Sequence, residues 1–219
     1  MIYINSLLKS SMKYRIMKLK KYYDAIVSNS SFYKAKIKQK LKILYNLLEY
    51  FKTIPNNPLI LENKTVIAQI EPTSMCNLEC EMCIRDKIGV PIGTMSFENF
   101  KIILDKLDSL FKIHLSGQGE PFLNSEIFRM IEYANKRGAI VYFVTNGTGL
   151  TDNIIKKICN VNIGEIAVSI DSPKKEVYEK IRKGAKWKIV IENIKNLTKK
   201  LEEKNKKTIV SFAITILKE

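Results

Sequence analysis

The chain has 219 residues, 46% of them hydrophobic, and carries a net charge of +15, which suits one domain with a buried core and a basic extension. No run of about 18 apolar residues occurs and the N-terminus lacks an apolar signal core, so we expect neither a membrane-spanning helix nor secretion. Four cysteines, three of them closely spaced, are unlike the disulfide framework of a secreted protein and predict free thiols in the cytoplasm.

The positive charge is concentrated in residues 1–63, for which we predict a basic helical extension. Residues 1–60 contain twelve Lys and Arg against two acidic residues, so this segment carries +10 of the total charge. Between residues 34 and 52, apolar side chains recur alternately four and three positions apart, which predicts an amphipathic helix. The expected apolar face consists of Ile37, Leu41, Leu44, Leu48 and Phe51.

Two interpretations of this extension are open. Its lysines and tyrosines could form a surface for nucleic acid or for an anionic membrane. The interpretation that we favour is a helix that packs on the domain and exposes its basic side to solvent, because lysine is abundant throughout the chain.

Residues 64–219 alternate between strand-like and helix-like segments, with Ser96 and either Thr151 or Asp152 as candidate helix N-caps. Repeated strand–helix units predict a parallel sheet or barrel. The predicted strands are residues 66–72, 112–116, 140–144, 165–170 and 207–216, and the predicted helices are residues 97–111, 124–137, 151–159 and 188–204.

Three cysteines follow the first predicted strand with the spacing C-x3-C-x2-C: Cys76, Cys80 and Cys83. Three thiolates on one loop need a cation to relieve their repulsion. A 4Fe–4S cluster normally takes four cysteines, so three leave one iron open to a small ligand. A zinc site with His114 as the fourth ligand is the alternative, whereas Cys159 is isolated and predicted to be a small buried apolar residue.

Two further loops follow predicted strands. The segment Gly117-Gln118-Gly119-Glu120 allows a ligand to approach the backbone, and its carbonyls together with the Glu120 carboxylate suit an ammonium group. Its plain alternative is a strand-to-helix connection. In Thr145-Asn146-Gly147, Asn146 either faces a cofactor cavity or only supports a turn.

The cysteine triplet, the glycine-rich segment and the Thr-Asn-Gly triplet occur in an order that resembles the radical SAM (S-adenosylmethionine) superfamily. The sequence is most similar to the subgroup with a C-terminal SPASM extension. The resemblance covers about residues 64–219 and implies an α/β fold, a partial parallel (βα) barrel. It also implies that Cys76, Cys80 and Cys83 hold a 4Fe–4S cluster and that SAM binds the fourth iron.

The same resemblance implies which residues contact SAM. Residues 117–120 would hold the amino group of its methionine part, although Gln118 replaces the first of two paired glycines in the family motif. Ser169 would lie against the ribose or the carboxylate, and Arg182 would bind the carboxylate. Asn146 would face the cavity, and Met82 would pack near the adenine, where the family more often has an aromatic residue; loop packing is an equal alternative for Met82.

The implied activity is reductive cleavage of SAM to methionine and a 5′-deoxyadenosyl radical that abstracts hydrogen from a substrate. Likeness to the subgroup suggests peptide or protein modification. An electron donor such as ferredoxin or flavodoxin is expected. Because five strands are predicted where the family usually has six, and no cysteine follows Cys159, we expect a truncated or split gene, or a partner chain that supplies the missing C-terminal part. The alternatives are a non-catalytic zinc or Fe–S module and a SAM-binding remnant.

Overall fold

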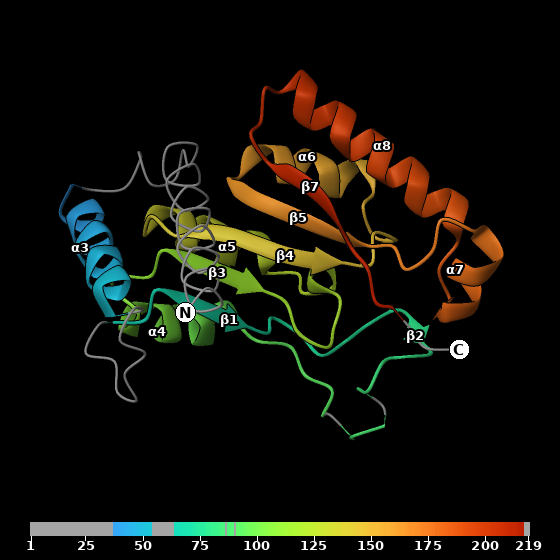
Figure 1. Ribbon diagram of the computed structural model, residues 1–219, viewed down its shortest axis with the longest axis horizontal. Helices are drawn as coiled ribbons and strands as arrows, with labels where there is room; N and C mark the ends of the chain where they lie inside the picture. Colours follow the sequence, from blue (N-terminus) through green and yellow to red (C-terminus); the bar gives the residue numbers. More distant parts are fainter. Residues whose placement is uncertain (1–36, 54–63, 86, 90, 217–219) are drawn as a thin grey trace, which may run out of the picture.

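The computed structural model describes residues 37–53, 64–85, 87–89 and 91–216 (Figure 1). Its main sheet has five strands in the order β1-β3-β4-β5-β7, and every neighbouring pair is parallel. The predicted α/β architecture is therefore confirmed, with strand limits shifted by a few residues. The strands are β1 (Ile67–Ile70), β3 (Lys112–Leu115), β4 (Ile140–Thr145), β5 (Ile163–Ser169) and β7 (Ile209–Ala213).

One face of this sheet carries the hydrophobic core. Alternate strand residues such as Ile113, Val141 and Ile166 are fully buried there, as period-two strand geometry requires, whereas His114 and Tyr142 on the other face are half-buried. Buried apolar side chains of four helices pack into the same core. These helices are α4 (Phe97–Lys106), α5 (Ile127–Lys136), α6 (Asp152–Asn160) and α8 (Trp187–Glu203).

Local sequence signals determine where α4 and α6 begin. The Ser96 side chain accepts a hydrogen bond from the backbone N–H of Asn99 at 3.2 Å, and the Thr151 side chain caps α6 in the same way. The predicted end of the first helix at residue 111 is wrong, because α4 ends at Lys106. Phe111 instead donates its backbone N–H to Val66 O at 2.9 Å, which draws it toward the start of β1.

The helix after β3 also begins later than predicted, at Ile127 rather than at residue 124. A short 3-10 helix, η2 (Pro121–Leu123), comes first. Asn124 is buried and its side chain donates to the carbonyls of Pro72 and Met95, at 2.8 and 3.0 Å. Asn124 is thus used to bind the segment after β1 and not to continue a helix.

The extension contains helix α3 (Ile37–Thr53), which covers the N-terminal ends of the strands (left in Figure 1). Ile43 and Leu47 are buried in a small cluster with Val66, Phe111 and Ile140. The interpretation of a helix packed on the domain therefore describes what is seen. Residues 1–36 and 54–63 lie outside the described residues, so the rest of the extension stays a prediction.

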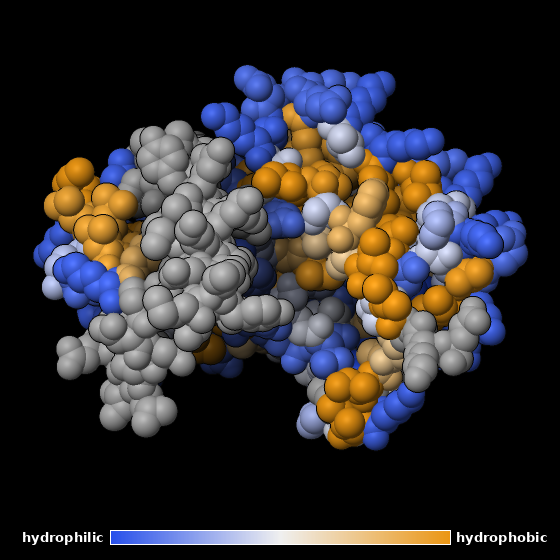
Figure 2. All heavy atoms as spheres, in the orientation of Figure 1, coloured by the Kyte–Doolittle hydropathy of each residue, from blue (hydrophilic) through white to orange (hydrophobic). Residues whose placement is uncertain are grey.

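The predicted packing face of α3 is wrong. Ile37, Leu41 and Leu48 are 71%, 60% and 61% exposed, and they contribute to the apolar surface over α3 in Figure 2. The buried polar residue Asn46 explains the rotation, since its side chain donates to Lys64 O at 3.0 Å and accepts from Lys64 N at 2.9 Å. Apolar periodicity alone does not reveal this anchor. None of the described helices is long and apolar enough to cross a membrane.

Candidate cofactor site

The cysteine loop begins directly after β1 and is anchored by the chain that leaves it. Thr73 Oγ1 donates to Gly93 O at 3.0 Å, and Ser74 Oγ donates to Pro91 O at 2.7 Å. The backbone N–H of Met95 donates to Pro72 O at 2.9 Å. The segment carrying the thiols is therefore closed at its base, at the C-terminal end of the parallel strands where α/β folds place their ligands.

A second clamp comes from far along the chain. Strand β2 (Glu79–Cys80) pairs antiparallel with β6 (Arg182–Lys183), which places Cys80 opposite Arg182. The Arg182 guanidinium contacts Cys80 through Nη1, 3.8 Å from Sγ. Strand β6 follows helix α7 (Lys175–Ile181), so the C-terminal half of the domain supports the cysteine loop.

The three thiols are free and half-buried. Burial raises the pKa of the Cys80 thiol, the Arg182 guanidinium opposes this, and the nearby Cys76 and Cys83 raise it further. Among the described residues, no group of three or more His, Cys, Asp or Glu side chains is arranged to hold a metal ion. The assignment of all three cysteines as metal ligands thus stays a prediction, supported by donor chemistry and by their common loop.

The zinc alternative gains no support from His114. This residue lies in the middle of β3, aligned with Gln69 of β1, and its ring stacks on Tyr142 at a centroid distance of 5.4 Å. Burial lowers its pKa, and Lys112 lowers it further. Cys159 is buried in the hydrophobic core, where its thiol donates to Lys200 O at 3.8 Å, as expected for a small buried residue.

The Glu120 carboxylate is buried and connects two strand ends. It accepts hydrogen bonds from Thr145 Oγ1 and from the Asn146 N–H, both at 2.7 Å, and a longer one from the Phe122 N–H. Burial raises the pKa of Glu120, and these hydrogen bonds oppose the shift. Its predicted contact with an ammonium group is not tested here and stays a prediction.

The glycine-rich loop lies against the segment that precedes the cysteines. A Cβ atom on Gly119 would overlap the carbonyl oxygen of Thr73, and one on Gly117 would overlap the side chain of Glu71. The backbone N–H of Gln118 donates to the Glu71 carboxylate, and that of Glu120 donates to Met75 O at 2.8 Å. Close approach of two backbones is the reason for glycine at these positions.

Asn146 faces the cysteine loop. Its side-chain Nδ2 donates to Asn77 Oδ1 at 2.9 Å and lies 3.9 Å from Cys76 Sγ. Its Oδ1 accepts from the Thr148 N–H at 2.9 Å, so the amide is held by its own turn. Of the two interpretations of Asn146, the turn role and the inward position are both present.

Arg182 is held by a buried acid. Its Nε donates to Asp171 Oδ2 at 2.6 Å, with side chains 11% and 0% exposed, and Asp171 Oδ1 accepts from the Thr215 N–H at 2.8 Å. Ser169 is buried as the last residue of β5, and Met82 is half-buried in the turn after Cys80. The SAM contacts predicted for Ser169, Met82 and Arg182 stay predictions.

Sequence reasoning missed several residues that shape this site, notably Glu71, Asn77 and Asp171. Glu71 and Asp171 share one signal, since each is a carboxylate one or two residues after a strand. Asn77 adjoins Cys76 and accepts from Asn146, while its Nδ2 donates to Thr148 Oγ1 at 2.8 Å. Their partners lie far away in sequence, so the pattern did not identify them.

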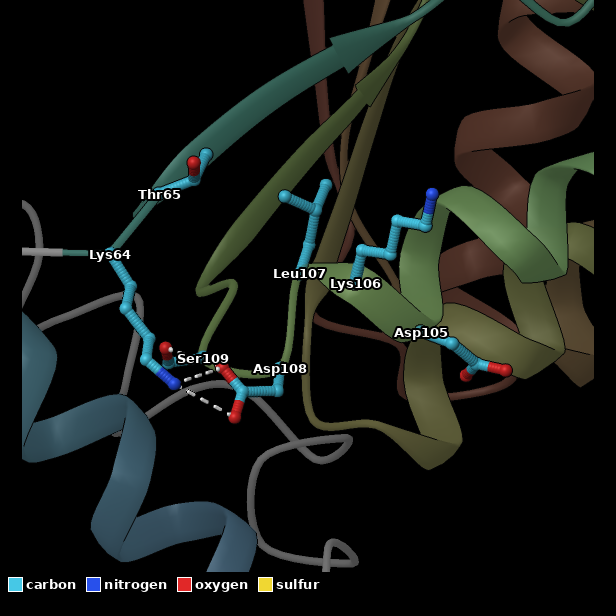
Figure 3. Close-up of a pocket in the computed structure, with 7 residues that line it drawn as sticks. All are labelled: Lys64, Thr65, Asp105, Lys106, Leu107, Asp108 and Ser109. Carbon is cyan, nitrogen blue, oxygen red and sulfur yellow. Dashed lines mark hydrogen bonds and ion pairs between the residues drawn. The ribbon is translucent and has the colours of Figure 1, made fainter.

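A separate hollow of about 400 Å³ lies at the opposite end of the sheet (Figure 3). Lys64 and Asp108 face each other there, joined by hydrogen bonds of 2.9 and 3.0 Å. This hollow lies between α4, β3 and the start of β1, away from the cysteines, and is not the cofactor site. Its lining consists of Lys64, Thr65, Asp105, Lys106, Leu107, Asp108 and Ser109.

The parallel sheet and the polar loops at its C-terminal edge define an α/β protein with a thiol-rich cofactor site. The sequence matches the family model of the radical SAM superfamily over residues 70–218, and the chain belongs to that superfamily. Membership implies a 4Fe–4S cluster and SAM as cofactors, in agreement with the sequence prediction. Three half-buried thiols with a guanidinium beside one of them suit a thiolate-bound cluster.

Relatives of known name match parts of the chain. It is 35% identical over 105 residues to the tungsten-containing aldehyde ferredoxin oxidoreductase cofactor-modifying protein of Pyrococcus furiosus, covering 47% of this chain and 30% of that protein. It is 26% identical over 130 residues to mycofactocin maturase MftC of Mycolicibacterium smegmatis, covering 58% and 33%. The chain thus matches about a third of the length of these relatives.

The fold is similar to that of Streptococcus suis SuiB, solved bound to its precursor peptide SuiA. The TM-score is 0.57 at 15% identity, and the match covers 78% of this chain and 37% of SuiB. At this identity the likeness concerns the fold alone, and it agrees with the predicted partial barrel.

Proposed function

We propose that this chain is the SAM-cleaving core of a radical SAM enzyme that modifies a peptide or protein. The observation that carries the proposal is the C-x3-C-x2-C loop at the C-terminal end of β1, with Arg182 beside Cys80 and Asn146 beside Cys76. Each of these two thiols therefore has a nitrogen donor near its sulfur, as expected around ligands of an iron–sulfur cluster.

In this proposal Cys76, Cys80 and Cys83 hold the cluster, and the loop of residues 117–120 receives the ammonium end of SAM. The cluster, when bound, supplies the electron that splits SAM into methionine and a hydrogen-abstracting 5′-deoxyadenosyl radical. The protein positions these groups. Arg182 is oriented by Asp171, and the Gly117 and Gly119 backbones lie close against residues 71–75 so that the loop keeps its shape.

The substrate class rests on relatives. Mycofactocin maturase MftC carries maturation in its name, and SuiB was solved with a precursor peptide. A partner chain that completes the substrate side is also proposed, because β7 is an edge strand whose Ile209 and Phe212 are largely exposed. A ferredoxin or flavodoxin is the proposed electron donor, and a reducing cytoplasm is the proposed location because the thiols must stay reduced.

The test is anaerobic reconstitution of the chain with iron and sulfide, followed by incubation with SAM and dithionite. We expect a brown protein with acid-labile sulfide and production of 5′-deoxyadenosine. Bound zinc without labile sulfide would instead support a non-catalytic metal module. A bound cluster with no 5′-deoxyadenosine would support a SAM-binding remnant, and either result would contradict the proposal.

A further inference from the structure

The hydroxyl of Tyr178 is buried without a partner. The side chain is 0% exposed, and among the described residues Tyr178 Oη is one of two buried side-chain polar atoms with no hydrogen-bond partner. Buried tyrosine hydroxyls usually find a partner, and each exception in a folded protein calls for an explanation. An acceptor that comes with a bound group is one such explanation.

Tyr178 belongs to the part of the chain that clamps Cys80. It lies in α7, and its carbonyl accepts the backbone N–H of Arg182, the residue paired with Cys80 across β2 and β6. The ring packs edge-on against Trp187 at a centroid distance of 5.1 Å and sits in the main core. The ring is therefore confined, and its hydroxyl cannot turn to solvent.

The charges that reach this hydroxyl identify its surroundings. Burial raises the pKa of Tyr178 to about 12, Arg182 lowers it, and Cys80, Asp171 and Glu179 raise it. The two carboxylates already accept from other donors, Asp171 from Arg182 and Thr215, and Glu179 from the Trp187 N–H at 3.0 Å. Cys80 remains as the neighbour that gains acceptor strength when it becomes a thiolate.

We propose that the Tyr178 hydroxyl donates a hydrogen bond to sulfur on the Cys80 side of the cluster site, next to the guanidinium of Arg182. The inference rests on the proposed function, because the sulfur becomes a strong acceptor when Cys80 is a thiolate ligand. Hydrogen bonds to the sulfurs of such sites raise metal retention and shift the reduction potential upward by stabilising the added negative charge.

The test compares Tyr178→Phe with the wild-type chain in two states, metal-free under reducing anoxic conditions and reconstituted. In the metal-free state we expect an unchanged or higher urea midpoint, since the change removes a hydroxyl that has no partner. In the reconstituted state we expect about ten-fold faster loss of iron to a chelator. A more negative cluster potential in an EPR-monitored titration is the second readout.

Tyr133→Phe is the matched control. Tyr133 Oη donates to Asp105 on α4, away from the cysteines, so this change should lower the metal-free urea midpoint and leave iron retention and potential unchanged. Iron retention and potential of Tyr178→Phe equal to wild type would overturn the inference alone. So would a lower metal-free urea midpoint, which means that the hydroxyl already has a partner. A wild-type chain that takes up no cluster would overturn the proposed function together with this inference.

Discussion

The two ends of the parallel sheet hold buried or half-buried carboxylates in opposite electrostatic settings. At the N-terminal end, Lys64 and Lys42 lower the pKa of Asp108 to about 2. At the C-terminal end, burial raises the pKa of Glu120, which has backbone and hydroxyl donors as its partners. One carboxylate is neutralised by cations, while the other is held by neutral dipoles.

The difference separates a structural end from a functional end. Around Asp108, Lys42 and Lys64 join α3 and the start of β1 to the α4–β3 loop. At the other end the polar groups converge on thiols, with Asn146 near Cys76 and Arg182 near Cys80. This agrees with the general rule for barrels, in which the strand C-termini carry chemistry and the N-termini carry stability.

The largest effect is expected at the cysteine loop. Cys80→Ala should abolish both the brown colour and SAM cleavage, because it removes a predicted cluster ligand and the partner of Arg182. Iron, labile sulfide and 5′-deoxyadenosine are measured after reconstitution. Cys159→Ala is the control, since this thiol lies in the core and should leave cluster content unchanged. Retained cleavage in Cys80→Ala would exclude the cysteine loop as the cluster site.

Breaking the buried ion pair should have the next largest effect. Asp171→Ala leaves the Arg182 guanidinium buried without its partner and should reduce the free energy of unfolding by about 3 kcal/mol, measured in urea. The double variant Asp171→Ala/Arg182→Met should recover part of that loss. Additive losses in the double variant would show that the pair is not coupled.

The glycine loop offers a sharper contrast between two glycines. A side chain on Gly119 would meet the rigid backbone of residues 73–75, so Gly119→Ala should lose about 2 kcal/mol of stability and weaken SAM binding. Gly149 has no atom within 4 Å of a built Cβ, so Gly149→Ala should leave both unchanged. Urea unfolding and calorimetric titration with SAM measure the two effects. Equal behaviour of both variants would contradict the close approach.

The smallest effect is expected at the structural end and depends on pH. The folded pKa of Asp108 lies below its usual value of 3.8, so the stability it contributes is present above about pH 4 and is lost as the pH falls toward 2. Asp108→Asn should lose about 1 kcal/mol at pH 7, since Lys42 and Lys64 are largely exposed, and nothing at pH 2. Urea midpoints at both pH values test this. The raised pKa of Glu120 has the opposite sign, because its contribution falls as the pH rises above its usual value of 4.5.

The sequence by itself determined the elements and the order of the chemistry. Apolar periodicity predicted the five parallel strands, and local polar residues predicted the caps at Ser96 and Thr151. These signals act over a few residues, so a linear reading captures them. The cysteine spacing and the motifs after successive strands also identified the family, because parallel strands bring their C-terminal ends to one edge.

Only the tertiary structure decided which distant groups meet. Cys80 and Arg182 are 102 positions apart, and their contact depends on the pairing of β2 with β6. The face that α3 buries was decided by the hydrogen bonds of Asn46 to Lys64, against the apolar pattern of the helix itself. Burial without a partner, as at Tyr178 Oη, is likewise a property of the packed chain, because it depends on every neighbour that excludes water.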